Sequence, residues 1–132
     1  MRVVALDHLV LTVRDVERTI AFYERVLGMN AVTFDAGRKA LAFGSQKINL
    51  HQLGKEFEPR ADQPTPGSAD LCFLADSPLA EVVAHLKRLG MSLVAGPVAR
   101  TGAIGVIDSV YLRDPDANLV EIAVYRSEPA NH

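Results

Sequence analysis

An internal repeat constrains the fold of this chain more than any single motif does. Residues 25–32 (RVLGMNAV) align with residues 87–94 (KRLGMSLV) at an offset of 62. At the same offset, residues 8–11 (HLVL) align with residues 70–73 (DLCF). Self-similarity at a fixed spacing is typical of a structural unit that occurs more than once. The sequence therefore predicts two copies of one unit.

Each copy is expected to begin with a strand and a helix. Residues 6–13 read as a strand whose alternation places His8, Val10 and Thr12 on one face and Leu9, Leu11 and Val13 on the other. Asp15 can then cap a helix that ends at Gly28. In the second copy Ser77 takes the position of Asp15, and Pro78 opens the helix, where a missing N–H has no cost.

Three further strands are expected in each copy, which gives an α+β fold of two tandem βαβββ modules. The predicted strands are residues 6–13, 30–34, 39–43, 47–53, 69–74, 92–95, 108–113 and 118–125. A loop with two glycines is expected at residues 97–105. The modules would form one domain over residues 5–126, with module 1 at residues 5–54, a Pro- and Gly-rich connector at residues 55–67 and module 2 at residues 68–126.

Charge and composition exclude several classes of protein. The 132 residues include 14 Lys and Arg against 16 Asp and Glu, so there is no basic surplus for generic nucleic-acid binding. No apolar run reaches the length of a membrane span, and the N-terminus lacks the features of a signal peptide. The single cysteine, Cys72, cannot form an internal disulfide. A cytoplasmic protein without a membrane partner is expected.

The repeat also pairs polar residues that interrupt apolar strands. At the last strands the offset lengthens to 72, which aligns Asn49 with Glu121. With His8 and its partner Asp70, these residues form a pseudo-symmetric quartet. His51 lies two residues from Asn49 and therefore shares its face of the strand. If the two copies pack about a pseudo-two-fold axis, their equivalent positions are expected to converge on a shared cleft.

Imidazole and carboxylate groups on converging strands favour a divalent metal site. The metal hypothesis assigns His8, Asp70, His51 and Glu121 as ligands. For His8 and Glu121, the alternative is a hydrogen bond that holds the modules together. Asp70 could instead contact the connector or a neighbouring subunit, and His51 could simply be hydrogen-bonded.

Three more residues are candidates for substrate binding. Asn49 is a better hydrogen-bond donor beside the metal than a ligand to it. Cys72 shares the face of Asp70 and could line the cleft, although a small buried hydrophobe is the alternative. Arg100 and the loop at residues 101–105 could close over an anionic substrate, or the glycines could simply form turns.

Three segments resemble the vicinal oxygen chelate superfamily, which includes glyoxalase I, fosfomycin-resistance thiol transferases, extradiol dioxygenases and bleomycin-resistance proteins. They are LDHLVLTV at residues 6–13, IAFYERVLGM at residues 20–29 and DPDANLVE at residues 114–121. The resemblance implies a cupped, partly open mixed sheet. It also implies a homodimer, which would protect the sheet edges.

The resemblance implies one metal ligand from the first strand and one from the last strand of each module. His8 and Glu121 match that pattern, whereas Asp70 stands where histidine is usual. Asn49 replaces a carboxylate of glyoxalase I, and His51 could supply that ligand from the same face. The family turn Asp-Pro-Asp-Gly-Asn carries Ala117 in place of glycine, which costs about 1 kcal/mol if φ is positive there.

The function that follows is a metal-dependent lyase, isomerase, thiol transferase or dioxygenase. A divalent ion (Mn, Fe, Ni, Mg or Zn) would chelate two vicinal oxygens of a small substrate, and Glu121 would act as the catalytic base. The alternative is a metal-free protein that sequesters a small molecule such as an antibiotic, as bleomycin-resistance members do.

Overall fold

A computed structural model of the protein describes residues 1–126. Its elements, in chain order, are β1 (His8–Val13), α1 (Val16–Leu27), β2 (Asn30–Phe34), β3 (Arg38–Phe43), β4 (Gln46–Gln52), β5 (Asp70–Leu74), α2 (Leu79–Arg88), β6 (Ala95–Thr101), β7 (Val106–Arg113) and β8 (Leu119–Tyr125). The predicted βαβββ order is confirmed in both modules. None of the helices in these residues is long and apolar enough to span a membrane.

The two modules form sheets of the same topology. The strand order is β1-β4-β3-β2 in the first sheet and β5-β8-β7-β6 in the second. In each sheet the first and last strands of the module are parallel neighbours, with Val10 opposite Asn49 and Cys72 opposite Glu121. The hydrogen-bond register therefore confirms the alignment of Asn49 with Glu121 that the sequence repeat predicted.

The chain divides into two compact units, and one of them is not continuous in sequence. Unit 1 contains Met1–Ala69 together with Asp114–Ala117, and unit 2 contains Asp70–Arg113 and the chain from Asn118 onward. Unit 1 thus takes in the turn that connects β7 to β8, although both of these strands belong to unit 2.

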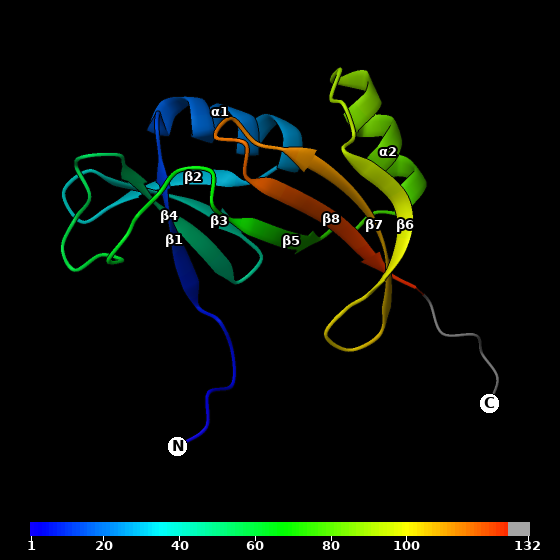
Figure 1. The fold of residues 1–132 in the computed structure, drawn as a ribbon, viewed down its shortest axis with the longest axis horizontal. Coiled ribbons are helices and arrows are strands. Elements are labelled where there is room, and N and C mark those ends of the chain that lie inside the picture. The colour runs from blue at the N-terminus through cyan, green and yellow to red at the C-terminus, as the bar shows by residue number, and fades with distance from the viewer. Residues whose placement is uncertain (127–132) are drawn as a thin grey trace. The chain divides into compact units, whose positions relative to one another are not determined.

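Helix α1 covers one face of the sheet of unit 1 (Figure 1). The Asp15 side chain accepts a hydrogen bond from the Arg18 N–H at 3.0 Å, and Gly28 ends the helix at φ 67°, as predicted. The buried apolar side chains of this layer come from α1, β1, β3 and β4: Leu11, Val13, Ile20, Tyr23, Val26, Leu41, Ile48 and Leu50. Polar side chains that point to the other face of the sheet remain free for function.

In unit 2, Val82 and Leu86 of α2 are buried, as are the apolar residues Val110, Leu112, Val120 and Ile122 of the adjacent sheet. The predicted cap at Ser77 is wrong by one residue. Pro78 occupies the cap position, and the Ser77 hydroxyl instead donates to the Asp76 carboxylate at 3.3 Å. No side-chain oxygen caps this helix, since proline offers none.

The loop predicted at residues 97–105 is also shorter than expected. Strand β6 begins at Ala95, three residues later than predicted, and continues through Pro97 to Thr101. Proline is tolerated because β6 is an edge strand and its register with β7 shifts between Ala95 and Val98. The sequence signal of proline and glycine here marks a bulge rather than the end of a strand.

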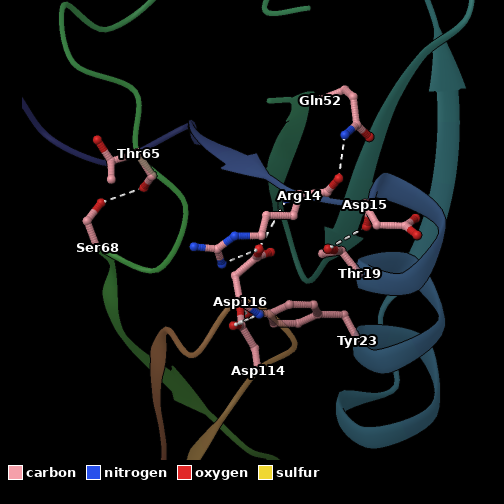
Figure 2. A network of polar contacts seen from close by, with 9 residues as sticks. All are labelled: Arg14, Asp15, Thr19, Tyr23, Gln52, Thr65, Ser68, Asp114 and Asp116. Carbon is pink, nitrogen blue, oxygen red and sulfur yellow. Dashed lines mark hydrogen bonds and ion pairs between the residues drawn. The ribbon is translucent and has the colours of Figure 1, made fainter. Parts of the chain in front are cut away.

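The turn at Asp114–Ala117 is fixed by a polar network inside unit 1 (Figure 2). The Tyr23 hydroxyl donates to Asp114 Oδ2 at 2.7 Å, and Arg14 donates to Asp116 Oδ1 from its backbone N–H and its guanidinium. Burial and the Asp114 carboxylate raise the pKa of Tyr23 far above its usual value, so the hydroxyl stays protonated. Ala117 has φ 66°, the conformation that the sequence comparison with the family turn anticipated.

Candidate functional site

Three of the predicted site residues share one face of the unit 1 sheet. His8 on β1 and Asn49 and His51 on β4 point away from α1, since side chains alternate along each strand. In the parallel pairing of β1 with β4, Val10 lies opposite Asn49 and Thr12 lies opposite His51. Asn49 and His51 are 6% and 2% exposed, whereas His8 is exposed to solvent.

His8 is oriented by its neighbour in sequence. Its Nδ1 donates to Asp7 Oδ2 at 2.8 Å, which leaves Nε2 of a neutral ring as the unprotonated nitrogen. A carboxylate that holds one ring nitrogen is the arrangement that prepares the other for a metal ion. The strand pattern predicted His8, but its partner Asp7 was not among the predicted site residues.

His51 faces a cation. The Arg38 guanidinium donates from Nη2 to His51 Nε2 over a long 3.5 Å contact. Burial first, and the Arg38 charge second, lower the pKa of His51, while Glu56 acts weakly in the other direction. His51 is therefore held neutral with Nε2 directed at Arg38, a position in which a metal ion would be repelled.

Asn49 carries an unusual feature for a buried amide. Its Oδ1 is buried and has no hydrogen-bond partner among residues 1–126. An unpaired buried acceptor costs about 1–3 kcal/mol, so native structures rarely keep one without a function. The sequence predicted a polar role for Asn49 beside the substrate, and the unpaired atom is consistent with that role.

In unit 2 the predicted residues Asp70, Cys72 and Glu121 share one face of the sheet. Cys72 lies directly opposite Glu121, and the Ser109 hydroxyl donates to Glu121 Oε2 at 2.6 Å. Burial, the Glu121 carboxylate and the Asp70 charge raise the pKa of Cys72 to about 11. The thiol therefore stays protonated in a region of negative potential.

Arg100 lies on the edge strand β6 of unit 2 and is exposed. Its Nε donates to the Tyr111 hydroxyl at 3.1 Å, and its guanidinium lies 5.6 Å from the centre of the same ring. Tyr111 is paired across the strands with Glu121. Arg100 therefore contacts Tyr111, the cross-strand neighbour of Glu121, rather than the loop at residues 101–105.

The structure thus places the predicted residues on two separate sheet faces. Among residues 1–126, neither unit contains three His, Cys, Asp or Glu side chains grouped closely enough to hold a metal ion by themselves. The sequence did not single out Arg38, Ser109 or Tyr111. Strand alternation places Ser109 and Tyr111 on the face of Glu121, so that signal was available, but nothing in the sequence linked Arg38 to His51.

The comparisons with known proteins agree with this fold. Residues 5–122 match the sequence profile of the Glyoxalase/Bleomycin resistance protein/Dioxygenase superfamily. The chain belongs to that superfamily. The resemblance noted from the three sequence segments is thereby confirmed, and the two-module fold is the one that this superfamily shares.

Two curated members of the superfamily are similar over most of this chain. Virulence protein STM3117 of Salmonella typhimurium is 62% identical over 120 residues, which cover 91% of this chain and 83% of that protein. Glyoxalase domain-containing protein RDO1 of Mycosarcoma maydis is 58% identical over 122 residues, covering 92% and 69% of the two chains.

Solved structures give the same result. The crystal structure of STM3117 superposes with a TM-score of 0.94 at 60% identity, over 96% of this chain and all of that one. Lactoylglutathione lyase from Agrobacterium tumefaciens gives 0.69 at 26% identity, over 91% and 92%. TnmS3, an antibiotic binding protein from Streptomyces sp. CB03234, gives 0.73 at 19% identity over 96% and 99%, and so shares the fold alone.

Proposed function

We propose that this chain is a metal-dependent enzyme of the glyoxalase type, acting on a small substrate with two vicinal oxygens. The observation that carries the proposal is the carboxylate pair of unit 2. Asp70 and Glu121 share one sheet face, and within residues 1–126 neither is paired with a lysine, arginine or histidine. Two carboxylates beside one protonated thiol form a negatively charged site that a bound cation would neutralise.

His8 is the third ligand that we propose. Its ring is turned by Asp7 so that Nε2 is available, and imidazole with carboxylates suits Mn, Fe, Ni, Zn or Mg. His51 fits less well, because the Arg38 cation lies against its Nε2. The ligand set that we propose is therefore His8, Asp70 and Glu121, completed within one chain or between two copies.

The chemistry follows from the donors. A divalent ion bound there would stabilise negative charge that develops on substrate oxygens. Glu121 would take a proton from the carbon beside those oxygens, with Ser109 holding its Oε2 in place. The protonated Cys72 thiol, opposite Glu121, would not compete with this carboxylate as a base.

Calorimetric titration tests the metal. Chelator-treated protein would be titrated with Ni, Mn, Fe(II) and Zn beside three variants: Glu121→Gln, His8→Gln and, as a matched control, Glu81→Gln on α2. We expect about one ion per site, with affinity weakened about tenfold or more by the first two substitutions and unchanged by the third. Absence of binding to the folded wild type would reject the metal mechanism.

The second candidate is a metal-free protein that sequesters a small molecule. The observation that favours it is in unit 1, where Arg38 is held between the rings of Phe34 and Phe57 rather than by a carboxylate. Binding proteins use such aromatic and cationic surfaces for organic ligands. A chelated protein that binds no metal ion but takes up organic anions would favour this function. Pairing of two copies into a homodimer and a cytoplasmic location stay predictions.

A further inference from the structure

Unit 1 carries two positive charges that no carboxylate among residues 1–126 pairs with. The Arg38 guanidinium lies 4.7 Å from the centre of the Phe57 ring and 5.2 Å from that of Phe34. Lys47 Nζ lies 3.7 Å from the centre of the same Phe34 ring. Within the described residues, neither cation forms an ion pair: aromatic rings contact both, and Arg38 has one further contact, to His51.

The remaining donors of Arg38 are available to a ligand. Its Nη2 contacts His51 Nε2, which must act as the acceptor because guanidinium only donates. No hydrogen bond within residues 1–126 is seen for the other guanidinium N–H groups. A planar fork of N–H donors beside a neutral imidazole is suited to a carboxylate, which it can bind through two parallel hydrogen bonds.

Asn49 is the second, independent observation. It lies on the same strand and the same face as Lys47 and His51, opposite the small side chain of Ala40 on β3. The residue is only 6% exposed, and its Oδ1 has no hydrogen-bond partner among residues 1–126. A buried acceptor of this kind requires a donor, and a ligand hydroxyl is the simplest group that could supply it.

Together these residues assign a ligand chemistry. We infer that Arg38, Lys47 and Asn49 bind a small hydroxycarboxylate: Arg38 takes the carboxylate, Lys47 adds positive potential and Asn49 accepts the hydroxyl. The Phe57 ring packs edge-on against His51, with a ring-centre distance of 5.6 Å, and so lies beside the same group of residues. This site goes beyond the proposed metal-dependent function, because it needs no metal ion and none of the unit 2 residues, and it gives the metal-free candidate a ligand class.

The Glu56 carboxylate, whose charge acts on His51, forms no ion pair with Arg38 or Lys47 among residues 1–126. Glu56 lies in the connector, and its side chain accepts hydrogen bonds from its own backbone N–H and from that of Gly54. These bonds lower the pKa of Glu56 and hold its charge on the connector backbone. Arg38 is therefore left for an external anion.

Nuclear magnetic resonance on the metal-free, full-length protein tests the inference. Chelator-treated, ¹⁵N-labelled protein would be titrated with glycolate to about 50 mM at constant ionic strength. Acetate, which lacks the hydroxyl, and glycolamide, which lacks the charge, are the matched probes. We expect shifts of the Arg38 Nε–H and Asn49 side-chain amide signals, with glycolate bound about five- to tenfold more tightly than either probe.

Substitutions distinguish binding at a specific site from non-specific electrostatic attraction. Arg38→Gln and Lys47→Gln are expected to weaken glycolate binding, by about tenfold and about threefold respectively. Arg60→Gln removes the same charge from the Glu58 ion pair of unit 1 and should leave the affinity unchanged. Two unfolding curves, of Arg38→Gln and Lys47→Gln, would show that both variants fold.

The outcomes distinguish this inference from the metal proposal. Glycolate that binds Arg38→Gln and Lys47→Gln as well as it binds the wild type would overturn the inference, as would equal shifts with acetate and glycolamide. Glu121→Gln should bind glycolate normally, because the site lies in unit 1. Loss of metal binding in that variant, with glycolate binding retained, would support both conclusions.

Discussion

The two modules share one backbone design but differ in the charge of their polar sheet faces. In both, the first and last strands are parallel neighbours, and equivalent residues are paired: Val10 with Asn49, and Cys72 with Glu121. The face in unit 1 presents two cations held by aromatic rings, whereas the face in unit 2 presents two carboxylates. Backbone pairing therefore fixes where a side chain points without fixing its chemistry.

The modules also differ in how they treat buried polar atoms. In unit 2 the buried Ser109 hydroxyl is satisfied by Glu121 at 2.6 Å. In unit 1 the buried Asn49 Oδ1 has no partner. A satisfied group stabilises the fold, whereas an unpaired one stores a cost that a ligand can relieve. The contrast indicates that the unit 1 face is complete only with its ligand.

The largest expected effect is on stability, at the turn of residues 114–117. This turn connects β7 to β8 in module 2, and module 1 has no equivalent of it. Asp114→Ala removes the buried acceptor of the Tyr23 hydroxyl and of the Asp116 N–H. We expect the free energy of unfolding to fall by about 3 kcal/mol or more, because two buried donors lose a charged partner. Urea denaturation would measure it.

The control for that turn is Asp108→Ala on β7. Asp108 forms a partly exposed ion pair with Arg126 at 2.6 Å, so its loss should cost about 1 kcal/mol or less. Equal losses in the two variants would show that the turn is no more than a surface feature.

The next largest effect is expected on the reactivity of Cys72, which depends on the negative potential of the unit 2 sheet face. Since the pKa of Cys72 is raised to about 11, little thiolate exists at pH 8, although the side chain is exposed. Iodoacetamide is expected to modify the native thiol about 10- to 100-fold more slowly than the unfolded chain, with the rate rising as pH approaches 11.

Glu121→Gln should speed this modification, since it removes the carboxylate that favours the protonated thiol. Glu81→Gln on α2 carries the same change of charge away from Cys72 and should have no effect. If the native thiol reacts as fast as the unfolded one, the contrast in potential between the two faces is wrong.

A smaller effect is expected on the free energy of unfolding, and it tests the comparison of the two buried polar atoms, Asn49 Oδ1 and the Ser109 hydroxyl oxygen. Asn49→Leu replaces the unpaired amide by an apolar side chain of similar size and should raise the free energy of unfolding by about 1 kcal/mol. Ser109→Ala should lower it by about 1 kcal/mol, since a satisfied hydrogen bond is lost. Thermal unfolding of both variants without ligand would give the two signs, and a loss in Asn49→Leu would contradict the contrast.

The smallest effect is in the backbone. Ala117→Gly should stabilise the protein by about 0.5 kcal/mol, since φ 66° strains alanine but not glycine. Ala84→Gly, the same substitution inside α2, should destabilise it by about 0.5–1 kcal/mol. Chemical denaturation of the two variants would show whether their free energies of unfolding change in opposite directions. A decrease in both would show that the turn is not strained.

Much of the fold could be predicted from the sequence because its signals are local. The Asp15 cap, the Gly28 end of α1 and the repeat of strand patterns each depend on residues close together in the chain. The predictions at Ser77 and Pro97 were wrong, because proline can occupy a cap position or a bulge in an edge strand as well as end an element.

The candidate site was harder to predict because the residues that contact one another there lie far apart in the sequence or are of types that do not by themselves indicate a function. The alignment of Asn49 with Glu121 followed from the repeat and is confirmed by the strand register. The cluster around Arg38 requires Phe57, which comes from a connector without regular structure. Strand periodicity says nothing about which side chain a connector brings back onto a sheet. Metal binding by His8, Asp70 and Glu121 stays a prediction.

The interrupted sequence of unit 1 limits how these modules can be exchanged. A fragment cut after Ala69 would contain every strand of the first sheet, yet it would lack Asp114, the acceptor for the buried Tyr23 hydroxyl. Recombination at the connector would therefore join a module to a foreign turn that must supply the same carboxylate. The two modules are therefore not interchangeable as separate fragments, because the first depends on a side chain that lies within the sequence of the second.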